Sequence, residues 1–127
     1  MRSYQLVKSV LDDSSKAVYQ GKIFVNSKAQ KTDGYQLSKA ILLDETSEFN
    51  AKPELEIYAD DVKCSHGSTS GSIDLNSVHY LKSRGIPEKE AYQMLVNGFL
   101  SEILEKLPKG KLKNFLIKKL ESQINGH

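Results

Sequence analysis

The sequence contains a single cysteine, Cys64, and no apolar run that approaches the ~20 residues needed to span a membrane. One cysteine excludes an intrachain disulfide framework and favours a reducing compartment. The residues at the start do not have the pattern of a secretory signal peptide. The P-loop motif Gly-x-x-x-x-Gly-Lys is also absent, because Glu105 stands where a glycine must precede Gly110 and Lys111. This excludes a self-contained P-loop ATPase.

Neither sign of charge is in clear excess. There are 18 Lys and Arg residues against 16 Asp and Glu residues, which gives a net charge of +2. That balance does not by itself indicate a nucleic-acid-binding protein. The chain is 39% hydrophobic and 27% charged over 127 residues, which is typical of a small globular protein.

Residues 1–73 consist of short apolar or alternating runs separated by polar clusters, a pattern typical of strands and turns. We expect strands near residues 4–11, 16–25, 35–43, 54–59 and 62–66, with breaks at 12–15, 30–34 and 48–53 and a turn at 68–72. Apolar triplets begin at Ile23, Ile41 and Ile57, at intervals of 18 and 16 residues. This spacing fits a solenoid whose turns each stack a strand on the preceding one. The triplets share no consensus, so a plain antiparallel sheet is the alternative.

Residues 74–127 have helical spacing of their apolar side chains. Asp74 is the expected N-cap of a short helix that Gly85 ends, and Pro87 is expected at the first position of a helix over residues 87–107. Pro108 and Gly110 end that helix, and a last helix is expected from about Lys111. We therefore expect two parts, residues 1–73 and 74–127. The apolar stripe of the middle helix includes Ala91, Leu95, Phe99, Ile103, Leu104 and Leu107.

The most distinctive local feature is Cys64-Ser65-His66-Gly67. On a strand, Cys64 and His66 point to the same face with Cβ atoms roughly 7 Å apart, so both could contact one metal ion. Two ligands do not close a tetrahedral site, and a second chain or a small molecule would have to supply the others. A half-buried cysteine beside a surface histidine is the simpler interpretation. A nucleophilic Cys–His pair is disfavoured, because residues i and i+2 on a strand have poor geometry for it.

The other two histidines and the lysines have simpler interpretations. His79, on the first predicted helix, is expected at the surface or an interface, and His127 is the last residue. The lysines beyond residue 105 are expected on a solvated helix face, with an acidic partner surface as the alternative. These lysines are Lys106, Lys109, Lys111, Lys113, Lys118 and Lys119.

Three stretches, residues 29–33, 52–67 and 80–86, closely resemble the C-terminal part of the SufB/SufD family of iron–sulfur cluster assembly proteins. The central stretch includes Asp61-Val62-Lys63-Cys64-Ser65-His66-Gly67 and is similar to the SufD branch rather than the SufB branch. The resemblance extends from about residue 9 to about residue 107. Family members are much longer, so the resemblance implies a C-terminal fragment.

The resemblance implies a fold and a set of partners. It implies the C-terminal coils of a right-handed parallel β-helix over residues 1–73 and a small helical domain over residues 74–127. It also implies a SufB-like subunit paired through the β-helix and a SufC-like ATPase docked on the helical domain. It places His66, with Cys64 beside it, at the interface where an iron–sulfur cluster or iron is held transiently and shared with the partner subunit. Phe99, Ile103 and Leu104 are the docking candidates for the ATPase.

We therefore expect a non-enzymatic scaffold subunit in a bacterial cytoplasm or a plastid, with no tightly bound cofactor, no nucleic acid and no membrane as partner. The isolated chain is expected to form a homo-oligomer, such as a dimer, through the open edge of its first strand. A β-solenoid interaction module in which Cys64 and His66 have no metal role is one alternative. A β-helix enzyme acting on a polymer is another, but the adjacent Asp60 and Asp61 would face opposite sides of a strand, which counts against it.

Overall fold

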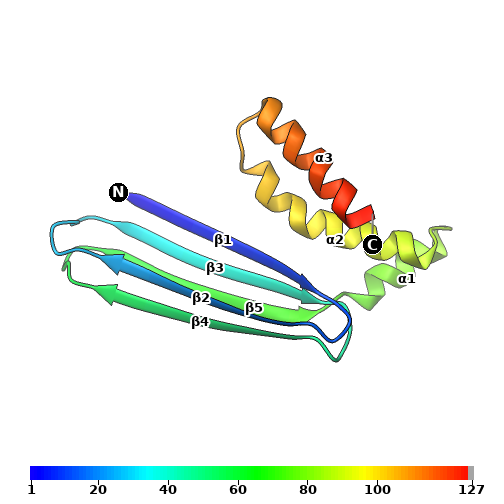
Figure 1. Ribbon diagram of the computed structural model, residues 1–127, viewed down its shortest axis with the longest axis horizontal. Coiled ribbons are helices and arrows are strands. Elements are labelled where there is room, and N and C mark those ends of the chain that lie inside the picture. Colours follow the sequence, from blue (N-terminus) through cyan, green and yellow to red (C-terminus); the bar gives the residue numbers. More distant parts are fainter. Residues whose placement is uncertain (126–127) are drawn as a thin grey trace. The chain divides into compact units, whose positions relative to one another are not determined.

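A computed structural model describes residues 1–125, which divide into two compact units, Met1–Ile73 and a second that begins at Asp74. Residue 127, the third histidine, lies outside the described residues. The first unit holds five strands, and the second holds three helices (Figure 1). None of the described helices is both long and apolar enough to cross a membrane.

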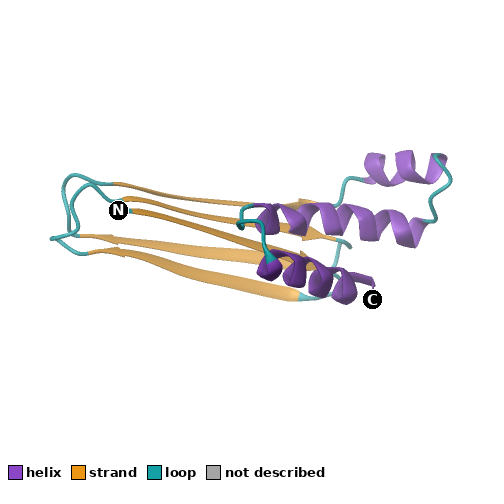
Figure 2. Ribbon diagram, turned by 90° about the horizontal axis from the view of Figure 1, so that it is seen from above, coloured by secondary structure: helices purple, strands orange, loops and turns teal. Residues whose placement is uncertain are grey.

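The five strands form two parallel sheets. They are β1 (Arg2–Leu11), β2 (Lys16–Val25), β3 (Asp33–Leu42), β4 (Glu48–Ile57) and β5 (Lys63–Ser72). One sheet has the order β1-β3-β5 and the other pairs β2 with β4, so successive strands alternate between the sheets. In Figure 2 the strands run side by side, with turns at both ends. The parallel pairing shows that the antiparallel alternative is wrong.

The strands repeat at about twice the interval expected from the apolar triplets. Arg2 pairs with Asp33, 31 positions later, and Lys16 pairs with Glu48, 32 positions later. Asp33 in turn pairs with Lys63, 30 positions later. The expectation that each strand stacks on the preceding strand is therefore wrong. Each strand pairs instead with the second strand before it in the chain: β3 with β1, β4 with β2, and β5 with β3. The triplets at 16 to 18 residues mark strands that belong alternately to the two sheets.

The sequence also contains a short repeat at this longer interval of about 31 residues, which the apolar triplets do not reveal. Tyr4-Gln5-Leu6-x-Lys8 recurs as Tyr35-Gln36-Leu37-x-Lys39, and the two copies are paired residue by residue in β1 and β3. The rings of Tyr4 and Tyr35 stack with centroids 5.6 Å apart, and Gln36 Nε2 donates to Gln5 Oε1 at 3.0 Å. Identical side chains stacked in register stabilise this pairing over shifted ones.

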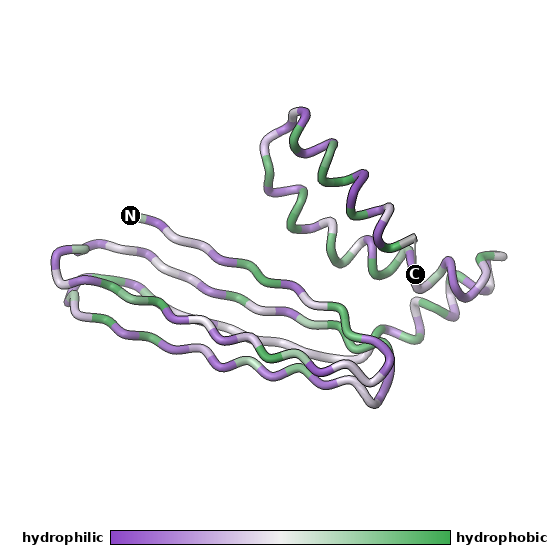
Figure 3. The backbone as a smooth tube through the Cα atoms, viewed as in Figure 1, coloured by the Kyte–Doolittle hydropathy of each residue, from purple (hydrophilic) through white to green (hydrophobic). Residues whose placement is uncertain are grey.

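Two stretches expected outside strands lie within them. Residues 48–53, expected as a break, open β4, and residues 68–72, expected as a turn, end β5. Both segments have low intrinsic strand propensity, because residues 48–53 contain Pro53 and residues 68–72 consist mainly of Ser and Gly. Pairing of β4 with β2 and of β5 with β3 overrides this low propensity. Pro53 is tolerated because β4 pairs with β2 alone among the described strands. Hydrophilic and hydrophobic segments alternate along β2 and β4 in Figure 3, as expected for strands with one buried face.

The second unit contains α1 (Leu75–Ser83), α2 (Glu88–Glu105) and α3 (Lys111–Asn125). The expected N-cap is confirmed, because the Asp74 carboxylate accepts hydrogen bonds from the backbone N–H groups of Asn76 and Ser77. Gly85 follows α1 with φ of 91°, a conformation that glycine adopts without strain. Pro87 was expected inside α2 but immediately precedes it, because its ψ of 149° is extended.

Asp44 holds the turn between β3 and β4. Its carboxylate accepts hydrogen bonds from the backbone N–H of Asp13 at 2.6 Å and from both the backbone and the hydroxyl groups of Thr46 and Ser47 at 2.8–3.0 Å. These donors, the Thr46 hydroxyl first, hold the pKa of the Asp44 carboxyl well below its usual range. The bond to Asp13 ties this turn to the turn between β1 and β2.

We predict that Asp44→Asn lowers the stability of the first unit at pH 7 and that the deficit shrinks in acid. Because the folded state depresses the pKa of Asp44, its contribution is fully present above the unfolded value near 3.8 and is lost as the pH falls toward the folded value. Urea unfolding between pH 7 and pH 3 measures this. Glu45→Gln, the same change of charge at the exposed neighbouring residue, is the control. Equal deficits for the two variants at pH 7 would contradict the prediction.

Candidate functional site

Cys64 and His66 both lie in β5, which confirms the strand expected there. In the register of the first sheet, Cys64 is opposite Gly34 and His66 is opposite Gln36 of β3. Side chains alternate between the two faces of a strand, so these two share one face. It is the face on which Gln36 is buried and on which Gly34 approaches Ile23 of the other sheet.

The two side chains differ in exposure. Cys64 is half-buried, and its Sγ lies 3.5 Å from the position that a Cβ on residue 34 would occupy. Gly34 therefore leaves room beside the thiol that any larger residue would reduce. His66 is exposed, because β5 is the last strand of its sheet among the described strands. The pair thus combines a partly sheltered sulfur with an accessible imidazole on one strand edge.

The structure brings no third strong ligand to this pair. Among residues 1–125, no three His, Cys, Asp or Glu side chains come together in a way that could hold a metal ion. Asp60 and Asp61 lie in the bend before β5 rather than on a strand, so the geometry assumed for them from the sequence is wrong. Asp61 serves the turn itself, because its backbone N–H donates to Gln30 Oε1 at 2.9 Å. His79 is exposed on α1 in the second unit.

A row of polar side chains next to the pair was not anticipated from the sequence. Gln36, opposite His66, is 3% exposed, and Ser38 is 2% exposed. Ser38 Oγ donates to Ser68 Oγ of β5 at 3.1 Å, which links β3 to β5 on the face that carries Cys64 and His66. The repeat of Tyr-Gln-Leu-x-Lys was the available signal, since it places Gln36 over Gln5 and thereby predicts the register.

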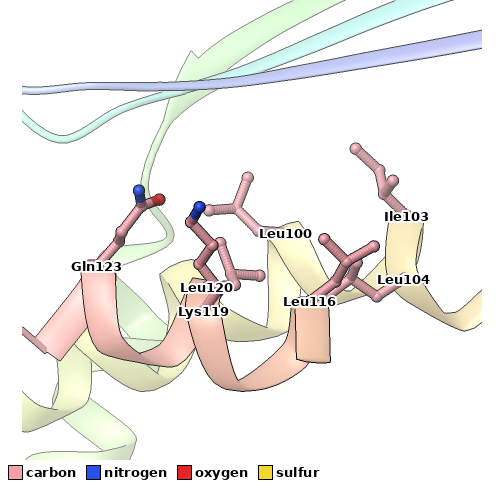
Figure 4. Close-up of a pocket in the computed structure, with 7 residues that line it drawn as sticks. All are labelled: Leu100, Ile103, Leu104, Leu116, Lys119, Leu120 and Gln123. Atoms are coloured by element: carbon pink, nitrogen blue, oxygen red, sulfur yellow. The ribbon is translucent and has the colours of Figure 1, made fainter. Parts of the chain in front are cut away.

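The expected docking residues, Phe99, Ile103 and Leu104, lie on α2, and Figure 4 shows the last two. Ile103 and Leu104 line a hollow of about 270 Å³ between α2 and α3, together with Leu100, Leu116, Lys119, Leu120 and Gln123. Leu104 and Leu120 also line a second hollow between the same helices, so they form the seam where α2 and α3 meet. Phe99 is half-buried and does not line either hollow. Ile103 is therefore better placed than Leu104 to contact a partner.

The lysines of the last helix are only partly on an exposed face. Lys111, Lys118 and Lys119 are exposed, whereas Lys113 is half-buried at the second hollow between α2 and α3. The apolar residues Leu112 and Phe115 of α3 are 66% and 60% exposed. The apolar side chains of this helix are thus only partly covered within the described residues.

The fold and the site together define a class: a parallel two-sheet β protein with a helical C-terminal unit and a Cys-x-His strand at the sheet edge. The family model for the SUF system FeS cluster assembly, SufBD core domain, matches residues 1–99. The chain belongs to this SufBD family.

Curated relatives agree with this assignment. The chain is 42% identical over 124 residues to the iron–sulfur cluster assembly protein SufD of Escherichia coli K12, which covers 98% of this chain and 29% of that protein. It is 40% identical over 112 residues to a SufBD family protein of Synechocystis and 39% identical over 113 residues to a chloroplastic protein, ABCI7, of Arabidopsis thaliana. Those matches cover 88% of this chain and 25% and 24% of the relatives. The chain thus spans less than a third of the length of these relatives, and the resemblance noted in the sequence is confirmed.

Proposed function

We propose that this chain is the C-terminal part of a SufD-like scaffold subunit, which pairs with a SufB-like subunit and docks a SufC-like ATPase during iron–sulfur cluster assembly. It catalyses no reaction of its own. The observation that carries the proposal is the placement of Cys64 and His66 on one face of β5, whose outer edge pairs with no other described strand. Family membership supports the cluster as the cargo.

The proposed fold of this part is the end of a right-handed parallel β-helix. Strands that alternate between two parallel sheets, with partners 30 to 32 residues apart, support two and a half coils of such a helix. An edge strand such as β5 presents unpaired backbone N–H and C=O groups that a partner strand can use. In the isolated chain the open edge of β1, the first strand, would pair with a second copy, so we propose a homodimer of the isolated chain.

The proposed chemistry of the site is that of a shared metal site. Thiolate and imidazole are both good ligands for soft metals, and Cys64 and His66 would supply half of a four-ligand set. The SufB-like subunit would supply the other ligands, so iron and sulfide would be held only at the interface. The chain alone would then bind no cofactor tightly. Bacterial and chloroplastic relatives support a bacterial cytoplasm or a plastid as the location.

The proposal is tested by co-purifying the chain, in its full-length context, with the SufB-like and SufC-like subunits and measuring bound iron and sulfide. We expect His66→Ala to leave the complex intact and to lower its cluster content by about tenfold or more, as loss of a metal ligand should. His79→Ala, at an exposed histidine on α1, is the matched control and should change neither. Full cluster content in the His66→Ala complex would instead support an interaction module without a metal role.

The proposed docking of the ATPase predicts different effects for substitutions at Ile103 and at Leu104 of α2. Ile103→Lys should weaken binding of the SufC-like ATPase while leaving the thermal midpoint of the chain nearly unchanged, because Ile103 lines a hollow open to solvent. Leu104→Ala should lower that midpoint, because Leu104 lies at the seam of α2 and α3, where large-to-small substitutions cost about 2–5 kcal/mol when fully buried and less here. Pull-down and thermal unfolding measure the two effects. Equal ATPase binding by wild type and Ile103→Lys would show that this hollow is not the docking surface.

A further inference from the structure

One side of α3 combines exposed lysines with exposed apolar side chains. Five residues recur along this side at intervals of three or four and are called the outer face of α3: Lys111, Leu112, Phe115, Lys118 and Lys119. The three lysines are exposed, and Leu112 and Phe115 are 66% and 60% exposed. The two apolar side chains lie between one lysine at the start of the helix and two lysines further along it.

The outer face points away from α2. The side chains of α3 that line the two hollows toward α2 include Leu116, Ile117 and Leu120. With 3.6 residues per turn, Phe115 and Lys118 lie about 150° around the helix from the mean direction of those three side chains. Of the outer face, only Lys119 borders the hollow of about 270 Å³. An ATPase docked at that hollow therefore leaves most of the outer face open.

The lysines of the outer face are not placed where they would stabilise α3. Lys111 lies in the first turn, where the helix dipole disfavours a cation, and the last turn carries no basic residue. Within residues 1–125, Lys111, Lys118 and Lys119 form no ion pair. The one carboxylate in the sequence of α3, Glu121, lines the second hollow instead. The outer face therefore carries three positive charges that nothing in the described chain balances.

An acidic protein segment matches this face better than an anionic membrane does. A helix that lies in a membrane interface buries a continuous apolar side by about 5–10 Å. The continuous apolar side of α3 already packs on α2, which leaves only Leu112 and Phe115 among the lysines. A stretch of protein with one or two apolar side chains flanked by carboxylates complements both the charge and the apolar surface of the face.

We propose that the outer face of α3 binds an acidic segment of a second protein, distinct from the ATPase. Leu112 and Phe115 contact the apolar side chains of this segment, and the lysines on either side of them pair with its carboxylates. Such pairs speed association and fix the orientation of the partner, and they weaken as salt rises because the charges are exposed. The proposal goes beyond the docking of the ATPase and does not depend on it.

The test is a titration of the 127-residue chain, at low ionic strength, with a fluorescent helical peptide built from Glu, Ala and Leu. A length of about 18 residues exceeds the ~12–15 residues below which isolated helices are marginal. A peptide with Lys in place of every Glu is the reference for charge. We expect the Glu peptide alone to bind, and Phe115→Ser and Lys118→Glu each to weaken this binding about tenfold or more. Leu75→Ser and Lys89→Glu, at exposed residues of α1 and α2, are the matched controls and should bind as the wild type does.

Several results would overturn the proposal. The first is no binding of the Glu peptide, or equal binding of the Glu and Lys peptides. The second is equal binding by the wild type and Phe115→Ser. Binding to phosphatidylserine vesicles that is lost in Phe115→Ser, without binding of the peptide, would make the face a membrane surface instead. Loss of the ATPase from the co-purified complex of Lys118→Glu would make the face part of the ATPase site, whereas an ATPase retained beside lost peptide binding supports a separate partner.

Discussion

Ala91→Asp is expected to unfold the helical unit. Ala91 lies in the first turn of α2 and is 0% exposed, so an aspartate there would place a carboxylate where water does not reach it. Burial of an unpaired charge is among the few mechanisms that cost more than about 4 kcal/mol, a large fraction of the stability of a small domain. Circular dichroism at 222 nm during urea unfolding measures the loss, because helical signal comes from this unit.

Met94→Asp is the matched control, since Met94 lies one turn further along α2 and is 50% exposed. The same new charge on the same helix should then cost about 1 kcal/mol or less. If the two variants lost the same helical signal at the same urea concentration, the effect would come from the altered charge or helix propensity rather than from burial. The assignment of the buried face of α2 would then be wrong.

Gly21→Ala is expected to destabilise the strand unit more than any other alanine substitution at its strand glycines. The new Cβ would lie 2.3 Å from Gln36 Nε2, so the buried amide must move and its hydrogen bond to Gln5 is lost. Overpacking costs about 1–3 kcal/mol and the lost hydrogen bond about 1 kcal/mol more. Thermal or urea unfolding of the chain measures the sum.

Two other glycines provide a graded comparison. Gly71 in β5 has no atom within 4 Å of the position of a Cβ, so Gly71→Ala should change stability by less than about 0.5 kcal/mol. At Gly67 the Cβ would lie 3.2 Å from the Tyr35 hydroxyl, and the expected cost is intermediate. An equal loss at Gly21 and Gly71 would show that glycine flexibility, rather than the space for Gln36, decides the effect.

The helices were largely predictable because their signals are local. Asp74 caps α1, Gly85 follows it with a positive φ, and the apolar residues of α2 recur at intervals of four. Each of these signals acts within one or two helical turns, so the sequence around it is sufficient. The boundaries of α2 differed from the expected ones by one residue at the start and two at the end.

The turns at Asp44 and Asp74 have the same hydrogen-bond pattern, yet a strand follows the first and a helix follows the second. Asp44 and Asp74 each follow the end of a strand by two residues, and each accepts hydrogen bonds from the backbone of residues i+2 and i+3 and from the serine hydroxyl at i+3. The chain then enters β4 after Ser47 but α1 after Asp74. The residues that follow decide the outcome: their apolar spacing is helical after Asp74, whereas pairing with β2 secures the strand after Ser47.

The site was predictable in part. The sequence indicated that Cys64 and His66 share one face of a strand, and both residues lie in β5, two positions apart. Gln36 and Gly21 could not be found by inspecting the neighbourhood of His66, because they lie 30 and 45 positions earlier in the chain. The stacked copies of Tyr-Gln-Leu-x-Lys connect β1 to β3, but only the pairing of β3 with β5 brings Gln36 beside His66.

The sequence by itself determined the division into a strand-rich and a helix-rich part, the helices, the lone Cys-x-His strand and the family. All of these depend on residues that are close together in the chain or on a contiguous motif. Only the tertiary structure decided that successive strands alternate between two sheets, that partners are 30 to 32 residues apart, and that Gln36 lies buried opposite His66. The physical reason is that parallel strands cannot be neighbours through a tight turn, so their register is set by contacts between distant segments.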